Sequence, residues 1–309
     1  MGAGQMGANH ARTIFRSDEF DLGFVVDSDA DRAGPLAESF GATPAGSLDG
    51  ISGIDAVVVA TSTASHHAIA REVLSLGIPV LIEKPLTPTF DSTVELVELS
   101  KAKGIPMQCG FVERFNPAFV TARRLIDKPV VHAQSVRHSP PAVRIASGVA
   151  EDLLIHDLDL AMSLASSPIK TVAGSVFPST LTGHDEISDC LLQFEDSSIF
   201  SLSASRMSQR KVRDWRICTD TDLIEVDLLR QTVAIYENIN QEVGSGGGAS
   251  YRARTTIDYP FIERAGEPLA MQLQHFARLL DGTVDVEAER DSILASHRVL
   301  SDFLSVSGR

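Results

Sequence analysis

The sequence predicts an α/β protein of two domains, and three observations carry this prediction. Short apolar runs alternate with helix-like stretches over residues 1–110, which is the pattern of parallel β/α units. A glycine motif at residues 2–7 opens the first helix-like stretch. After Gly110 come strand-like runs joined by short turns, typical of an antiparallel sheet. We expect a nucleotide-binding parallel domain over residues 1–110 and an α/β domain with a largely antiparallel open sheet over residues 111–309.

In the N-terminal domain, four buried strands should alternate with four helices. We expect the strands at residues 24–27, 56–60, 79–82 and 105–109, and the helices at residues 8–15, 32–40, 66–76 and 91–103. Gly77 and Gly104 stand where left-handed helix ends are expected. The strand that should lead into the first glycine is missing. We therefore expect the sequence to start one strand late and to leave backbone groups of the neighbouring strands unpaired.

The C-terminal domain should begin with two helices, at residues 117–126 and 149–164. Strand-like runs follow at residues 170–177, 190–194, 199–203, 212–219, 223–228 and 232–236. The glycine-rich stretch 244–248 is expected to be a flexible loop, and two helices at residues 268–280 and 289–306 close the chain.

Composition excludes several classes of protein. A net charge of −14 and a pI near 5.0 disfavour nucleic-acid and anionic-membrane partners, which require clustered Lys and Arg. The three cysteines are far apart and show no zinc or disulfide spacing, and no apolar run has the roughly 20 residues of a membrane span. We expect a protein of the reducing cytoplasm.

The glycine motif G-x-G-x-x-G indicates a dinucleotide site. Gly2 would make the tight turn, Gly4 would let the backbone approach a pyrophosphate, and Gly7 would let the helix pack closely. Asp27 follows the next strand, where a carboxylate reaches both ribose hydroxyls and repels a 2′-phosphate. NAD is therefore favoured, Arg32 leaves NADP possible, and a simple turn aspartate is the alternative.

Two further motifs carry chemistry. Glu83-Lys84-Pro85 follows a buried strand at the carboxyl edge, where it is either functional or a surface ion pair. Asp152 and His156 are four residues apart on an expected helix. This histidine is a hydrogen-bonded core residue, a metal ligand, or a general base oriented by the carboxylate. Since no nearby motif supplies further ligands, we expect no metal.

Taken in order, these motifs, with Ala60-Thr61-Ser62-Thr63 and His66, resemble the Gfo/Idh/MocA oxidoreductase family (glucose–fructose oxidoreductase, inositol dehydrogenase and relatives). The resemblance covers essentially the whole chain, including Glu267-Pro268-Leu269 before a closing helix. It implies an N-terminal Rossmann domain that binds NAD and a C-terminal sheet that forms a homodimer or homotetramer.

The resemblance also implies residue roles. Lys84 would hydrogen-bond the reacting hydroxyl, His156 would accept its proton, and Asp152 would orient the substrate or the histidine. The implied cofactor residues are Gly2, Gly4, Gln5, Met6, Gly7, Asp27, Ser28, Arg32, Thr61, Ser62, His66, Glu83 and Lys84. The implied substrate residues are Arg114, Asn116, Asp152 and His156.

The stretch Glu113-Arg114-Phe115-Asn116-Pro117 is similar to that of members acting on nucleotide-linked amino sugars. A cluster of Arg206, Arg210 and Lys211 would meet a substrate diphosphate or form a solvated strand edge. The alternatives are a polyol dehydrogenase of the inositol type, a glycosidase that retains NAD, and a non-catalytic NAD-binding sensor. Intact Lys84, Asp152 and His156 argue against the sensor.

Overall fold

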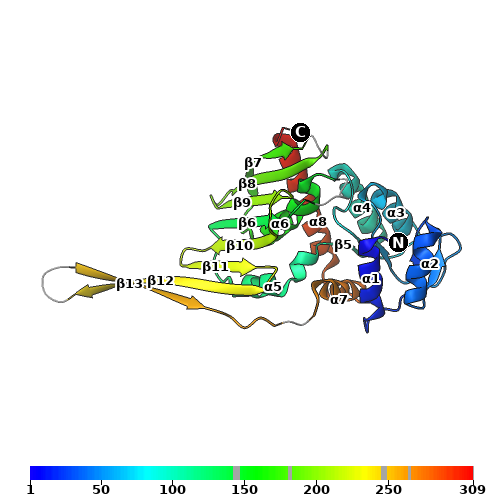
Figure 1. Ribbon diagram of the computed structural model, residues 1–309, viewed down its shortest axis with the longest axis horizontal. Helices are drawn as coiled ribbons and strands as arrows, with labels where there is room; N and C mark the ends of the chain where they lie inside the picture. Colours follow the sequence, from blue (N-terminus) through cyan, green and yellow to red (C-terminus); the bar gives the residue numbers. More distant parts are fainter. Residues whose placement is uncertain (142–146, 180–182, 245–248, 264–265, 309) are drawn as a thin grey trace. The chain divides into compact units, whose positions relative to one another are not determined.

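The computed structural model describes residues 1–141, 147–179, 183–244, 249–263 and 266–308. By its internal contacts the chain forms two compact units (Figure 1). The N-terminal unit comprises Met1–Phe115 and Gly266–Ser301, and the C-terminal unit comprises Asn116–Ala265 and Asp302–Arg309. The sequence places a single boundary at residue 110. The closing segment 266–301 instead belongs to the N-terminal unit. This unit is therefore formed by two segments that are far apart in the sequence, which a single boundary cannot describe.

The N-terminal unit contains parallel strands in two separate sheets. β1 (Phe24–Val26) pairs with β2 (Thr43–Ala45), while β3 (Val57–Val59), β4 (Val80–Ile82) and β5 (Met107–Cys109) form a three-stranded sheet in that order. β4 is buried at every position, as expected for a strand covered on both faces. The parallel β/α architecture predicted from the alternating apolar runs is therefore confirmed.

Helices connect these strands and cover the sheets. They are α1 (Gln5–Phe15), α2 (Ala30–Ser39), α3 (Thr63–Ser75), α4 (Phe90–Lys103), the 3₁₀ turn η1 (Val112–Phe115), α7 (Pro268–Leu280) and α8 (Val286–Val306). α3 and α4 lie side by side in Figure 1. Asp29 caps α2 through the backbone N–H of Asp31, and Gly104 ends α4 with a left-handed φ of 65°, as its position predicts.

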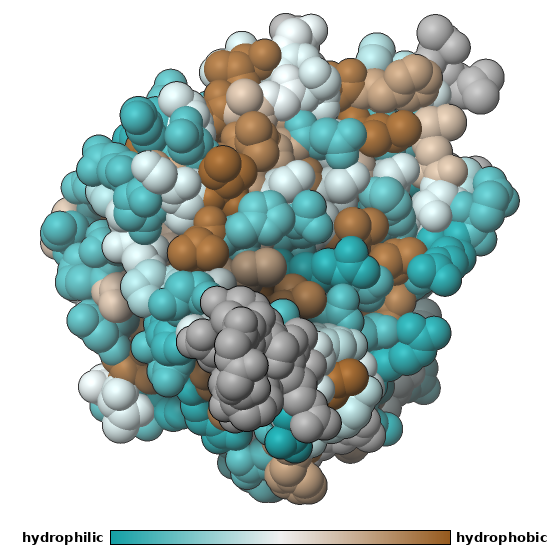
Figure 2. Space-filling view, turned by 90° about the vertical axis from the view of Figure 1, so that its left-hand side faces the viewer, coloured by the Kyte–Doolittle hydropathy of each residue, from teal (hydrophilic) through white to brown (hydrophobic). Residues whose placement is uncertain are grey.

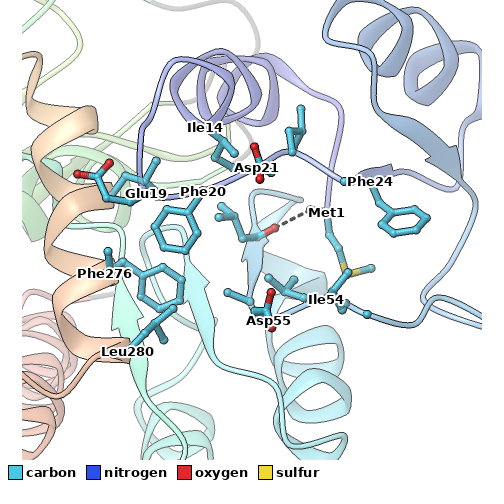
Figure 3. A pocket seen from close by; sticks show the side chains of 18 of the residues that line it. Met1, Ile14, Glu19, Phe20, Asp21, Phe24, Ile54, Asp55, Phe276 and Leu280 are labelled. Atoms are coloured by element: carbon cyan, nitrogen blue, oxygen red, sulfur yellow. Dashed lines mark hydrogen bonds between the residues drawn. The ribbon is translucent and has the colours of Figure 1, made fainter.

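The first two residues bridge the two parallel sheets. Gly2 N–H donates to Val26 O at the end of β1, and Met1 O accepts from Ala60 N–H after β3. Beside them lies a cavity of about 870 Å³ lined by β1, β3, α7 and the segment that follows α1. Figure 3 shows Phe20 and Phe276 stacked along it, with ring centroids 6.1 Å apart, and Met1 across from them. Among the described residues no strand joins β1 to β3, which is the gap expected from the sequence.

The C-terminal unit is built on one eight-stranded sheet in the order β13-β12-β11-β10-β6-β9-β8-β7. Six of its seven strand pairs are antiparallel and β6–β9 is parallel, so the largely antiparallel sheet is confirmed. Its strands are β6 (His132–His138), β7 (Ile169–Pro178), β8 (Asp185–Phe194), β9 (Ile199–Ser205), β10 (Val212–Cys218), β11 (Asp222–Asp227), β12 (Thr232–Gly244) and β13 (Ala249–Asp258). Figure 1 shows the β12–β13 hairpin projecting beyond the other strands.

Helices cover one face of this sheet. α5 (Pro117–Leu125), the π-helical turn η2 (Ala150–Leu154) and α6 (Ile155–Leu164) contact it. Alternate residues of the strands, among them Phe200, Leu202 and Trp215, are buried on that face. One helix was predicted over 149–164; its first turn is wider than an α-helix, and Asp152 lies in that turn.

Three strands were missed from the sequence. β2 contains Pro44 and is mostly exposed, so it carries no apolar run. β6 reads His-Ala-Gln-Ser-Val-Arg-His, and its buried positions hold only small or polar residues. β13 consists mainly of polar and charged residue types. Most of the predicted glycine-rich loop, residues 245–248, lies outside the described residues.

Candidate functional site

The three glycines of the motif differ in what a side chain at each position would contact. Gly2 has a φ of 91°, and a Cβ on it would lie 2.6 Å from Ala60 O. A Cβ on Gly7 would lie 1.7 Å from Gly2 O, so the helix can approach the turn only without a side chain. A Cβ on Gly4 would meet nothing within 4 Å. The motif thus folds into a tight turn that leaves open space at Gly4, which fits the close approach of a pyrophosphate.

The N-terminus of α1 presents exposed groups beside this open space. Gly4, Gln5 and Met6 are exposed, and the first turn carries no acidic side chain. Free backbone N–H groups at a helix N-terminus favour an anion. Thr61 and Ser62 follow β3 at the same carboxyl edge, and Ser62 precedes the first residue of α3. The structure therefore gathers these predicted cofactor residues around one edge.

Asp27 follows β1 and is fixed by two backbone hydrogen bonds. Its carboxylate accepts from Ala3 N–H at 2.7 Å and from Asp29 N–H at 2.9 Å. Partial burial alone would raise the pKa of Asp27, but these hydrogen bonds and the charge of Arg32 hold it below its ordinary value. An ionised carboxylate here suits ribose hydroxyls and opposes a 2′-phosphate. Ser28 and Arg32 are exposed next to it, and Arg32 pairs with Asp29 at 3.1 Å.

Lys84 follows the end of β4. It is only partly buried, whereas its neighbours Glu83 and Pro85 are buried. Glu83 accepts a hydrogen bond from His10 Nε2 at 2.7 Å. A Cβ on Gly110 would lie 3.0 Å from Glu83, so a side chain at the adjacent strand end would require Glu83 to shift. His66, predicted at the cofactor, is buried, with its ring nitrogens 3.1 Å from Pro85 O and Thr61 O. Its contacts are with the backbone of the site.

Asp152 and His156 belong to the C-terminal unit, and the buried Arg206 lies beside Asp152. The guanidinium of Arg206 lies 3.7 Å from Asp152 and donates to Glu186 at 2.9 Å and to Ser147 O at 2.7 Å. Arg206 is therefore a buried partner of carboxylates. The predicted basic cluster is not one surface, because only Arg210 and Lys211 of the three are exposed.

The residue after His156 is also anchored. Asp157 accepts from Arg137 Nε at 2.7 Å and Nη2 at 3.0 Å, and from Trp215 Nε1 at 3.1 Å. Arg137 is 2% exposed and Asp157 1%. This pairing fixes the start of α6 against β6 and β10. Sequence reasoning assigned no role to Arg137, because it lies in a strand without an apolar pattern.

Arg114 and Asn116, predicted to meet substrate, make contacts within their own units. Arg114 pairs with the buried Glu289 at 3.3 Å and lies 4.9 Å from the centre of the Phe111 ring. Burial alone would raise the pKa of Glu289, but a hydrogen bond from His275 and the charge of Arg114 hold it below its usual value. Asn116 caps α5 through Ala118 N–H and donates to Leu228 O at 3.0 Å. These contacts give both residues structural roles.

The residues at the carboxyl edge fit NAD: the open turn at Gly4 fits the pyrophosphate and the ionised Asp27 fits the ribose. In the part of the chain that the structure describes, no group of three His, Cys, Asp or Glu side chains could hold a metal ion. None of the described helices is both long and apolar enough to cross a membrane.

Comparison with known proteins finds similarity to two enzymes, one of which also has a solved structure. The chain is 27% identical over 239 residues to the UDP-N-acetylglucosamine 3-dehydrogenase of Acidithiobacillus ferrooxidans, covering 76% of this chain and 75% of that protein. It is 27% identical over 317 residues to the NAD(+)-dependent scyllo-inositol 2-dehydrogenase of Bacillus subtilis, covering 95% and 89%. The solved structure of the A. ferrooxidans enzyme GnnA superposes with a TM-score of 0.85 at 24% identity, covering 99% and 94%.

Two family models match in tandem. The model described as "Oxidoreductase family, NAD-binding Rossmann fold" matches residues 1–111, and the "GFO/IDH/MocA C-terminal domain" matches residues 117–224. Together they span most of the chain, and this protein belongs to the Gfo/Idh/MocA family of NAD-binding oxidoreductases.

Proposed function

We propose that this oxidoreductase acts on a secondary hydroxyl of a sugar, with a nucleotide-linked sugar as the favoured substrate. The position of Lys84 carries the proposal. A partly exposed lysine follows β4 at the carboxyl edge where Gly2 contacts Ala60 after β3. A cation there can stabilise the negative charge that develops on an alcohol oxygen during oxidation.

The residues divide the chemistry between them. NAD, when bound, takes up the hydride from the alcohol carbon. Lys84 donates a hydrogen bond to the hydroxyl oxygen, and its charge favours the alkoxide-like transition state. His156 accepts the hydroxyl proton as the C–H bond breaks and the carbonyl forms. Asp152, kept beside Arg206, orients a substrate hydroxyl or the histidine.

Two relatives support different substrates for the same residues. The A. ferrooxidans enzyme is named for a nucleotide-linked amino sugar, which favours the leading proposal. The B. subtilis enzyme is named for scyllo-inositol and aligns over more of this chain, which makes a free polyol the second candidate.

The test is a cofactor-reduction screen on the full chain. We expect NAD reduction at 340 nm with UDP-N-acetylglucosamine or another UDP-sugar, and weaker reduction with myo- and scyllo-inositol. Lys84→Met should lower kcat by about 10²–10³-fold. Lys101→Met is the matched control, because Lys101 is exposed on α4 and pairs only across the surface with Glu287. Full activity of Lys84→Met would contradict the assignment, and sugar release without net NADH would indicate a redox glycosidase.

We further propose that the eight-stranded sheet forms the contact of a homodimer or homotetramer. Phe177, Leu191 and Ile199 are exposed on neighbouring strands. On the side of the molecule seen in Figure 2, hydrophobic residues gather in bands among hydrophilic ones. Light scattering on wild type and Leu191→Glu tests this, because a buried glutamate at the contact should shift the mass toward the monomer. The cytoplasm stays the proposed location, in keeping with three cysteines that form no disulfide among the described residues.

A further inference from the structure

Three buried histidines converge on the four-residue segment 83–86 that carries Lys84. His10 comes from α1, His66 from α3 and His297 from α8, so two elements of the first quarter of the chain meet there with one from its end. All three are almost fully buried. Each contacts a different group of the segment, and none of the three contacts is with the Lys84 side chain.

The first contact precedes Lys84. His10 Nε2 lies 2.7 Å from Glu83 Oε1, and Glu83 Oε2 accepts from the Lys84 backbone N–H at 3.3 Å. Because α1 also begins at the glycine turn, this contact joins the cofactor turn to the lysine backbone. The second contact follows Lys84: His66 Nδ1 lies 3.1 Å from Pro85 O.

The third contact fixes the next peptide. His297 Nε2 accepts a hydrogen bond from Leu86 N–H at 2.9 Å, while Nδ1 donates to Ile293 O at 2.8 Å. This pair of partners requires a neutral ring with its proton on Nδ1. Burial lowers the pKa of His297 to about 4, against its ordinary 6.5, so the ring remains an acceptor at neutral pH. Leu86 is fully buried, and without His297 its N–H would lose this partner.

We propose that His10, His66 and His297 are positioning residues that hold the backbone on both sides of Lys84, an inference that rests on the proposed role of Lys84. A lysine ammonium stands at the end of a flexible four-carbon stem. Its position can be defined only if the backbone that carries the stem is itself fixed. Small displacements of an oriented group cost large factors in rate. The clamp sets the backbone from which the Lys84 side chain extends.

The test compares His297→Leu, which removes the acceptor, with His297→Gln, whose amide oxygen reaches a similar distance. In hydrogen exchange without cofactor, His297→Leu should lose at least tenfold protection at the Leu86 amide, and His297→Gln should retain it. With NAD and the substrate found in the screen, His297→Leu should lower kcat at least tenfold while the NAD dissociation constant stays within threefold. His297→Gln should recover most of the rate.

His67→Leu is the matched control. His67 is next to His66 on α3, but it is partly exposed and pairs with Glu95 at the surface. This variant should change neither the exchange of Leu86 nor kcat. If His297→Leu does not fold, His66→Leu supplies the same two measurements, with exchange again read at the Leu86 amide, which belongs to the same peptide as Pro85 O.

Unchanged exchange or unchanged kcat in the folded leucine variant overturns the clamp, as does a glutamine variant that behaves like the leucine one. Lys84→Met separates this failure from failure of the proposed function. If Lys84→Met is inactive while the leucine variant keeps wild-type kcat, the clamp fails and the role of Lys84 stands. If Lys84→Met is fully active, the proposed function fails. Hydrogen exchange at the Leu86 amide then still tests whether the histidines hold the backbone.

Discussion

Replacing Arg137 by Gln should remove a large part of the stability of the C-terminal unit. Arg137 makes two short hydrogen bonds to Asp157, and both side chains are at most 2% exposed. The change leaves a buried carboxylate with one remaining hydrogen bond shown here, from Trp215. Breaking a buried pair by removing one partner costs about 3–5 kcal/mol. Two charge-assisted hydrogen bonds at roughly 1.5–3 kcal/mol each give a similar loss.

Arg216→Gln provides the matched control on the same sheet. Arg216 pairs with Glu225 at 3.1 Å across β10 and β11, but its side chain is 64% exposed and that of Glu225 37%. Exposed pairs contribute about 0–1 kcal/mol because solvent screens them. Urea unfolding followed by tryptophan fluorescence measures both variants. Trp215 is the only tryptophan and contacts Asp157 directly, so its signal reports on this unit.

A double-mutant cycle separates pairing from general packing. Asp157→Asn in the Arg137→Gln background replaces the unpaired carboxylate by a neutral amide, and we expect it to recover at least about 2 kcal/mol relative to the single change. A loss below about 1 kcal/mol for Arg137→Gln, or a loss equal to that of Arg216→Gln, would refute the reasoning.

Three further predictions concern the N-terminal unit. Gly4→Ala should change the free energy of unfolding by at most about 0.5 kcal/mol and weaken NAD binding, whereas Gly7→Ala should destabilise the unit because its Cβ would meet Gly2 O at 1.7 Å. Calorimetric titration measures NAD binding and melting curves measure stability. Equal stability of the two variants would contradict the steric argument. The lowered pKa of His297, about 4 against 6.5, means that the unfolded chain binds this proton more readily, so about 3 kcal/mol of stability present above pH 6.5 should be lost as the pH falls toward 4. Urea midpoints at pH 7 and 4.5 measure this loss, and His297→Gln should show less of it than wild type. An engineered extension of about five apolar residues before Met1 should occupy the adjoining cavity and raise the melting temperature by at least about 5 °C, whereas a Gly-Ser extension of equal length should not.

The buried strands and the helices of the N-terminal unit were predictable because their signals are local, whereas the exposed β2 was missed. β1, β3 and β4 are continuous apolar runs, and polar residues follow directly where each run ends. The glycine motif, Asp27 and Lys84 could therefore be placed at one edge from spacing alone.

The remaining features depend on partners that spacing does not reveal. β6 was missed because Arg137 occupies a core position, which is tolerable only because α6 supplies Asp157. Arg206 was grouped with Arg210 and Lys211 as an exposed cluster, yet Glu186 and Asp152 bury it. A run of positive charges does not say which of them finds a carboxylate from a distant part of the chain.

The two motifs to which we assign the proposed chemistry have one feature in common. In E-K-P, both residues flanking Lys84 are anchored: His10 binds Glu83, and His66 lies against Pro85 O. In D-x-x-x-H-D, the acids on either side of His156 are anchored, since Arg206 lies beside Asp152 and Arg137 binds Asp157. A side chain that moves a proton or stabilises a changing charge must respond to the substrate, so the buried polar contacts that fix it are better made by its neighbours. The flanking residues of each motif therefore fix the backbone that carries the reactive residue. Substituting them should lower kcat although no reacting group is removed.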